Sequence, residues 1–213
     1  MDIKSPSIII AGCGPGSVEY LTPAVRKAVE RAEVLVGARR LLDLFPGHRA
    51  EKIVVGSDIE NILGDIDSRR GSRQIVVLVT GDPGLCSLAR PILKRFGRRT
   101  CEVIPGISSV QVAFARIGID WLDARIIDAH GENPDLKPES LINEGKIAIF
   151  AGRSEAIRWV AGIVKAIGKR RRVYLCENLT LENEEISQVQ PDDLEKMKAS
   201  SRSIILIIKE EEL

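Results

Sequence analysis

The sequence is poor in the residues from which metal sites and nucleophilic active sites are built. It contains two histidines, His48 and His130, and none of its four cysteines belongs to a Cys-x-x-Cys pair. Zinc-binding folds need closely spaced cysteine and histidine ligands, so this pattern excludes a zinc finger and predicts no metal site. Reduced thiols in a cytoplasmic protein are expected at Cys13, Cys86, Cys101 and Cys176.

The sequence also lacks a strong net charge and long apolar runs. Lys and Arg total 31 against 30 Asp and Glu, a net charge of +1. Bulk electrostatics therefore favour neither a nucleic acid nor a membrane surface as partner. No apolar run approaches the roughly 18 residues of a membrane span, and the N-terminus lacks the basic and apolar regions of a signal peptide. We expect a cytoplasmic protein.

Apolar, β-rich runs alternate with amphipathic segments along the chain. Strands are expected at 7–12, 33–37, 74–81, 100–106, 124–131, 146–152, 172–178 and 203–210. Helices are expected at 23–32, 87–97, 108–118 and 155–168. Because the strand runs are apolar almost throughout, they indicate strands buried on both faces, as in parallel sheets. The predicted class is α/β, and an interruption at 118–123 suggests domains 1–120 and 121–213.

The segment Gly12-Cys13-Gly14-Pro15-Gly16 follows the first expected strand as a tight turn. A dinucleotide site needs G-x-G-x-x-G and an acidic residue after the second strand, but Ser17 and Arg39-Arg40 stand there. Rossmann-type methyltransferases can also read GCGPG, usually after an acidic residue, where this chain has Ile10-Ala11. A turn that binds no ligand is a third interpretation of the glycines taken alone.

Two further strands run into Gly/Pro-rich loops, Gly81-Asp82-Pro83-Gly84 and Pro105-Gly106-Ile107-Ser108-Ser109. The carboxyl ends of parallel strands share one edge of a sheet, which is where open α/β sheets bind ligands. Each loop also has a structural interpretation, since Asp82 can make an Asx-turn and Ser108 or Ser109 can cap the next helix. Three such loops at one edge together favour a binding site.

These loops and three longer segments resemble the tetrapyrrole methylases, which depend on S-adenosylmethionine. The segments are VGARRLLDLFP (36–46), VIPGISSVQVAFARIGIDWLDARIIDAHG (103–131) and CENLTLENEEI (176–186). They resemble in particular the members that methylate C5 of a cobalt-precorrin, a corrin-ring intermediate of cobalamin biosynthesis. One departure is Leu85-Cys86, where an aromatic residue is common. The resemblance implies a homodimer, with two α/β domains per chain and the cofactor in the cleft between them.

The resemblance also implies the residues of the site. Contacts to S-adenosylmethionine would come from Pro15, Gly81, Asp82, Leu85, Ser108, Ser109, Ala151, Leu179 and Ser203. The Asp82 carboxylate would offset the positive charge of the sulfonium and α-ammonium groups. Arginines could pair with the acetate and propionate groups of a tetrapyrrole, or be ordinary solvated side chains: Arg39, Arg116 and Arg153, with Arg40 and Arg125 nearby.

The resemblance leaves the catalytic machinery largely open. Displacement at the methyl group of a sulfonium depends mainly on alignment of the two substrates, which fits the absence of a Ser/His/Asp set. His130 could orient substrate or shuttle a proton, although a loop histidine is structural at least as often. Two alternatives to the C5-methyltransferase remain. One is another family member, acting at a different ring carbon or, like diphthine synthase, on a protein. The other is a non-catalytic S-adenosylmethionine-binding regulatory module.

The extent of the reaction is a further expectation. In this pathway, methylation at C5 is coupled to methylation at C15 and to decarboxylation. The C15 activity belongs to a Rossmann-type domain of its own, of on the order of 150 residues or more. The two expected domains use the whole chain, so we expect a single methyl addition at C5 and a separate C15-methyltransferase partner.

Overall fold

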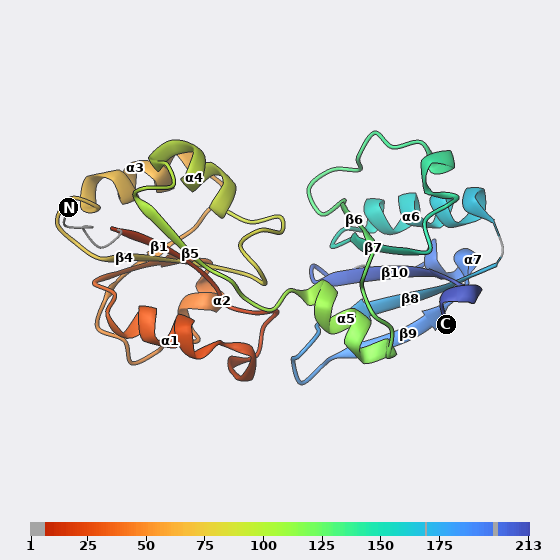
Figure 1. Ribbon diagram of the computed structural model, residues 1–213, viewed down its shortest axis with the longest axis horizontal. Coiled ribbons are helices and arrows are strands. Elements are labelled where there is room, and N and C mark those ends of the chain that lie inside the picture. Colours follow the sequence, from red (N-terminus) through yellow and green to blue (C-terminus); the bar gives the residue numbers. More distant parts are fainter. Residues whose placement is uncertain (1–6, 169, 198–199) are drawn as a thin grey trace. The chain divides into compact units, whose positions relative to one another are not determined.

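The computed structural model describes residues 7–168, 170–197 and 200–213 (Figure 1). The chain divides into two compact units, one ending at Ser108 and one spanning Ser109–Leu213. The sequence placed this division after residue 120. The structure places it before helix α5 (Ser109–Ile117), because α5 contacts a strand of the second sheet. Within the described residues, no helix combines the length and the apolar character needed to cross a bilayer.

The first unit is built on a parallel sheet with the strand order β3-β2-β4-β1-β5. Its strands are β1 (Ile8–Gly12), β2 (Val34–Gly37), β3 (Glu51–Val54), β4 (Ile75–Val79) and β5 (Cys101–Ile104). Every residue of β2 and β4 is buried. The prediction of parallel strands is therefore confirmed for this unit, and burial on both faces holds for the inner strands but not for the edge strand β5, where Glu102 and Val103 are exposed.

Two helices cover each face of the parallel sheet (Figure 1). The helices are α1 (Pro23–Glu30), α2 (Arg39–Leu42), α3 (Ile59–Arg69) and α4 (Ala89–Phe96), with a 3-10 turn, η1 (Val18–Tyr20). Apolar side chains of α3 and α4 pack on one face, and those of α1 and α2 on the other. Helix α1 begins as predicted: the Thr22 hydroxyl accepts from the Val25 N–H at 3.3 Å, and Pro23 occupies the first turn.

The second unit holds a mixed sheet with the order β6-β7-β10-β8-β9. Only β6 and β7 are parallel, whereas β10 runs antiparallel to both β7 and β8, and β9 antiparallel to β8. Its strands are β6 (Arg125–Asp128), β7 (Lys146–Phe150), β8 (Arg171–Glu177), β9 (Glu185–Val189) and β10 (Ser203–Lys209). The prediction of parallel strands is thus wrong here. Strand β10 is buried along most of its length in an antiparallel setting, so an apolar run reports burial and not strand direction.

Helix α6 (Ser154–Ile167) supplies the largest helical part of the second core, and it ends as predicted at Gly168. The unit also contains α7 (Pro191–Leu194), η2 (Pro138–Leu141) and η3 (Glu210–Glu212). All eight predicted strands are present, and the α/β class is confirmed. The sequence analysis missed the edge strands β3 and β9, whose residues are mostly exposed or half-buried, and the helices α2, α3 and α7.

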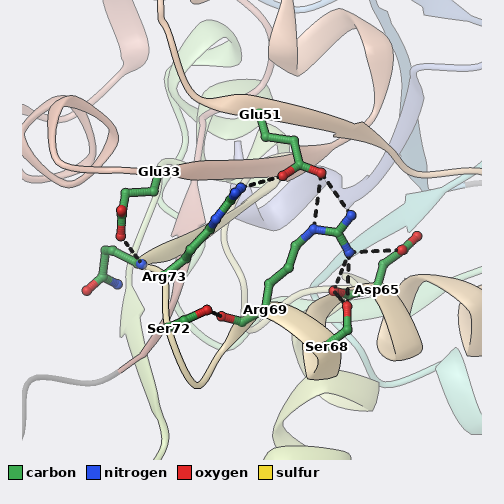
Figure 2. Close-up of polar contacts among 8 residues, drawn as sticks. Glu33, Glu51, Asp65, Ser68, Arg69, Ser72 and Arg73 are labelled. Atoms are coloured by element: carbon green, nitrogen blue, oxygen red, sulfur yellow. Dashed lines mark hydrogen bonds and ion pairs between the residues drawn. The ribbon is translucent and has the colours of Figure 1, made fainter.

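An ion-pair network closes the amino-terminal edge of the first sheet (Figure 2). The Glu51 carboxylate, at the start of β3, accepts from Arg69 Nε at 3.1 Å and Nη2 at 2.8 Å, and from Arg73 Nη1 at 2.5 Å. Beside it, Glu33 Oε2 accepts from the Gln74 N–H at 2.8 Å. The hydrogen bond from Arg69 and the charges of both arginines hold the pKa of Glu51 below its ordinary value. The network ties an edge strand to the end of α3.

Replacing Glu51 by Gln should lower the melting temperature at neutral pH and weaken the loss of stability in acid. A carboxylate whose pKa is lower in the folded than in the unfolded state stabilises the fold above the unfolded value, about 4.3 for Glu. That contribution disappears as the pH falls through the folded pKa. Thermal melts between neutral and acidic pH test this, with Glu102→Gln, an exposed position on β5, as control. Equal melting temperatures and equal acid sensitivity in Glu51→Gln and wild type would contradict the prediction.

Candidate functional site

The three glycine-rich loops of the first unit begin at neighbouring strand ends. Strands β4, β1 and β5 are adjacent and parallel, so their carboxyl ends share one edge. An isolated bridge joins the first two loops: the Gly81 N–H donates to the Gly14 carbonyl at 2.8 Å, and the Gly14 N–H to the Gly81 carbonyl at 3.4 Å. The structure therefore brings the predicted loops together.

The glycines in these loops are required by backbone packing. A Cβ on Gly106 would lie 2.3 Å from the Gly81 carbonyl oxygen and 2.5 Å from that of Gly12. A Cβ on Gly12 would lie 2.6 Å from the Gly106 nitrogen and 2.7 Å from the Gly81 oxygen. Three backbones thus meet at distances that no side chain permits. The sequence identified the glycines, but only the structure shows that they contact one another.

Asp82 links the second loop to the third. Its Oδ1 accepts from the Gly84 N–H at 2.7 Å, which is the Asx-turn that the sequence allowed, and its Oδ2 accepts from the Gly106 N–H at 3.1 Å. Both carboxylate oxygens therefore hold backbone of the site. Because a carboxylate offers about four lone-pair sites, each oxygen can still accept a further bond.

The other candidates along these loops belong to the first unit, except Ser109, which begins the second. Pro15 is buried, and Leu85 is half-buried, with its N–H donating to the Asp82 carbonyl at 3.1 Å. Cys86, which follows Leu85, has a left-handed backbone with φ 49°, a conformation that non-glycine residues seldom adopt. Ser108 is buried at the end of the third loop, and Ser109 is the first residue of α5.

Cys13, inside the first loop, is unsuited to act as a nucleophile. Burial is the main cause that raises the pKa of its thiol to about 12, against smaller lowering effects from the Val79 backbone and Arg40. The thiol therefore stays protonated at neutral pH, and it donates to the Ala11 carbonyl at 3.6 Å. This cysteine serves the packing of the turn.

Three candidates of the second unit share one edge of its sheet, where β7 and β8 end and β10 begins. The Ala151 N–H donates to the Ser203 carbonyl at 3.0 Å. The Ser203 hydroxyl lies 3.0 Å from Glu177 Oε1 and 2.8 Å from the Ser200 carbonyl oxygen. The side chains of Ala151, Leu179 and Ser203 are all buried, so a ligand at this edge would meet mainly backbone.

Leu179 stands between two residues with left-handed backbone, Asn178 with φ 49° and Thr180 with φ 69°. A positive φ is rare for a β-branched residue, and such strain is often found at functional sites. Glu184 Oε2 accepts from the Thr180 N–H at 2.5 Å. Glu184 in turn accepts from Arg116 Nε at 2.6 Å and Nη2 at 3.3 Å, and the Arg116 hydrogen bond holds the pKa of Glu184 below its ordinary value.

Some of the candidate arginines are bonded to other groups of the protein, and others are exposed side chains. Arg116, expected to bind substrate, is bonded to Glu184, and Arg153 donates from Nε to the His130 carbonyl at 3.0 Å. Arg39 is exposed at the start of α2. Arg40 donates from Nη2 to Thr80 Oγ1 at 2.6 Å, beside the second loop. Arg125 is exposed on the edge strand β6.

His130 lies in the loop that follows β6. Its Nδ1 lies 2.5 Å from Asp128 Oδ1, and its N–H donates to the same oxygen at 3.1 Å. Asp128 and Glu184 are the partners that sequence reasoning missed. The spacing Asp-x-His was visible for Asp128, whereas nothing local distinguished Glu184 from its acidic neighbours. Among the described residues, no cluster of three or more His, Cys, Asp or Glu side chains could hold a metal ion.

Replacing Gly106 by Ala should destabilise the protein by about 1–3 kcal/mol or more, the usual cost of overpacking. A matched control is Gly64→Ala inside α3, where a new Cβ meets nothing within 4 Å. That change should stabilise by about 0.5–1 kcal/mol, since glycine is a poor helix former. Denaturant unfolding measures both. Equal stability of the two variants would show that the three loops do not need close backbone contact.

A family model and a curated relative place this chain in the same family. The model of the Tetrapyrrole (Corrin/Porphyrin) Methylases matches residues 7–195. A cobalt-precorrin-7 C(5)-methyltransferase of Salmonella typhimurium is 35% identical over 180 residues, which cover 84% of this chain and 88% of that protein.

Solved structures agree with this match. Precorrin-6Y methylase (CbiE) from Archaeoglobus fulgidus has a TM-score of 0.70 at 29% identity, covering 95% of this chain and 96% of that one. Uroporphyrin-III C-methyltransferase from Thermus thermophilus, solved with S-adenosylhomocysteine, has a TM-score of 0.78 at 17% identity, covering 94% and 91%. As the resemblance predicted, this chain belongs to the tetrapyrrole methylases.

Proposed function

We propose that this protein transfers the methyl group of S-adenosylmethionine to C5 of a cobalt-precorrin in cobalamin biosynthesis. The observation that carries the proposal is its 35% identity, over 180 residues, to a cobalt-precorrin-7 C(5)-methyltransferase. Neither compact unit is long enough to contain that alignment alone, so the similarity extends over both. The matched residues therefore include strand-end loops of both sheets.

The glycine-rich loops of the first unit support S-adenosylmethionine as the cofactor. This cofactor carries no phosphate, so its site needs small residues and accessible backbone instead of a basic cradle. Gly14 and Gly81, with φ 74° and 65°, adopt left-handed backbone that glycine tolerates, and their pairing sets the course of the first two loops. When bound, the cofactor supplies an electrophilic methyl group on a sulfonium, a good leaving group. We retain as proposed contacts Pro15, Gly81, Asp82, Leu85, Ser108, Ser109, Ala151, Leu179 and Ser203.

The chain's own residues would mainly bind and orient. The three tied loops present a rigid surface, and preorganised positioning is a large part of catalysis in a two-substrate reaction. Of the proposed substrate arginines, Arg116 and Arg153 would have to exchange internal partners for a substrate carboxylate. Arg39 is exposed on α2, so we favour it for pairing with an acetate or propionate group.

We also propose a cytoplasmic homodimer that leaves the C15 methylation to a separate enzyme. The four cysteines are free thiols, which supports a reducing compartment. The family match runs through both units, so neither is left over to serve as a second, C15-type methyltransferase domain. Light scattering of the purified protein would decide between monomer and dimer.

The purified chain, incubated without oxygen with methyl-labelled S-adenosylmethionine and a panel of cobalt-precorrins, should label cobalt-precorrin-7 by one methyl group. Mass spectrometry with fragmentation locates that group at C5. Labelling of a different intermediate only, labelling of a protein, or cofactor binding without any transfer would each replace the proposal by one of its alternatives. Loss of carbon dioxide from the product would contradict the proposed separate C15 enzyme.

Asp82 variants test two roles of the carboxylate: holding the backbone of two loops and binding the cofactor. Asp82→Ala removes both backbone bonds and the charge, so it should lower the melting temperature and weaken S-adenosylhomocysteine binding. Loss of one charged hydrogen bond, about 1.5–3 kcal/mol, corresponds to roughly ten- to a hundredfold in affinity. Asp82→Asn keeps one acceptor oxygen and should lie between Asp82→Ala and wild type in both calorimetry and thermal melts. A stable Asp82→Ala protein with normal affinity would show that the link between the loops is unimportant.

A further inference from the structure

We propose that His130, oriented by Asp128, accepts the proton that the methyl transfer releases. This inference rests on the proposed function, because it needs a tetrapyrrole carbon as nucleophile. A mechanism that depends only on alignment of the two substrates gives His130 no role, and this proposal gives it one.

The imidazole ring is held in one tautomer by Asp128. An ionised carboxylate can only accept hydrogen bonds, so the 2.5 Å contact between Asp128 Oδ1 and His130 Nδ1 requires the proton on Nδ1. In the neutral ring, Nε2 then carries a lone pair and can act as a base. No hydrogen bond to Nε2 occurs within the part of the chain that the structure describes.

The loop that carries His130 is fixed as well. Arg153 Nε donates to the His130 carbonyl at 3.0 Å, and its Nη2 donates to the Ala129 carbonyl at 3.2 Å and to Asn133 Oδ1 at 2.9 Å. The Asp128 carboxylate also accepts from the His130 N–H at 3.1 Å. Both the backbone and the ring of this exposed residue are therefore positioned, which a purely solvated histidine does not need.

The ring borders a hollow formed by the loop that follows β6. A cavity of about 430 Å³ is lined by Asp128, His130, Gly131, Glu132 and Pro134. Strands β6 and β7 are parallel neighbours, so the loop after β6 begins beside Ala151, which follows β7. The His130 side chain is 56% exposed, which allows an accepted proton to pass on to water.

The proposed methyl transfer needs a proton acceptor. The nucleophilic ring carbon uses its electron pair to form the new bond to the methyl carbon, and the pair of the breaking C–S bond stays with sulfur. The sulfonium charge thereby passes to the tetrapyrrole, and the product returns to the charge of the substrate when it loses one proton. His130 Nε2 takes that proton, and the Asp128 carboxylate stabilises the resulting imidazolium as the proton moves to solvent.

Chemical rescue tests the role directly. His130→Gly should lower kcat at least about 100-fold, the lower range for general acid–base catalysis, with S-adenosylhomocysteine affinity unchanged. Added imidazole should restore part of kcat. His48→Gly, in the other unit, is the matched control and should leave kcat unchanged. Full activity of His130→Gly, or a loss that imidazole does not rescue, would overturn the proposal.

A second measurement does not depend on turnover. Nitrogen NMR of the ligand-free protein should show His130 protonated on Nδ1, and Asp128→Ala should shift the ring toward the Nε2-protonated form that free histidine prefers. An Nε2-protonated ring in the wild-type protein would contradict the assignment. If wild type methylates no cobalt-precorrin at all, the proposed function fails, and this tautomer result stands apart from it.

Discussion

The close approach of three backbone loops at Gly12, Gly81 and Gly106 is the constraint on which the first unit's candidate site depends. A Cβ at Gly106 would stand 2.3 Å from the Gly81 oxygen. The Asp82 carboxylate then fixes the third loop to the second through the Gly106 N–H at 3.1 Å. Because the loops hold one another, the edge of the sheet offers backbone in a defined arrangement, which suits a ligand without phosphate.

In the second unit, backbone at the candidate edge is also held in position, but side chains hold it instead of close glycine contacts. Its candidate residues lie where β7 and β8 end and β10 begins, in a largely antiparallel sheet. Glycine does not set the conformation around Leu179. Two non-glycine residues in left-handed conformation flank it, and the Glu184 carboxylate, paired with Arg116, holds the Thr180 N–H. A nearby carboxylate, itself paired with an arginine 68 residues away, thus positions backbone at this edge.

Much of the fold could be predicted from local sequence pattern, because buried strands are made of apolar residues. The runs at 7–12 and 74–81 are apolar since their strands are covered on both faces. Strand β3 was missed because it is an edge strand with mostly exposed residues. The direction of β10 could not be read, since an apolar strand looks the same in parallel and antiparallel sheets.

The candidate site was predictable only in part, because local sequence shows where loops follow strands but not which side chains pair. Loops that follow adjacent parallel strands share one edge of a sheet, so the sequence could predict that the loops of Gly81, Asp82 and Ser108 lie together. Pairings between side chains depend on tertiary structure, and the partners of Arg116 and Arg153 could not be read from sequence spacing. An arginine that binds substrate and one that ties down a loop look alike until their neighbours are known.

A crystal structure with S-adenosylhomocysteine and a cobalt-precorrin bound together tests the central claim most directly. The account predicts that the homocysteine sulfur lies beside the loops of Gly14, Gly81 and Gly106, with C5 as the ring carbon nearest to it. A cofactor bound away from these loops, or a different ring carbon nearest the sulfur, would contradict it.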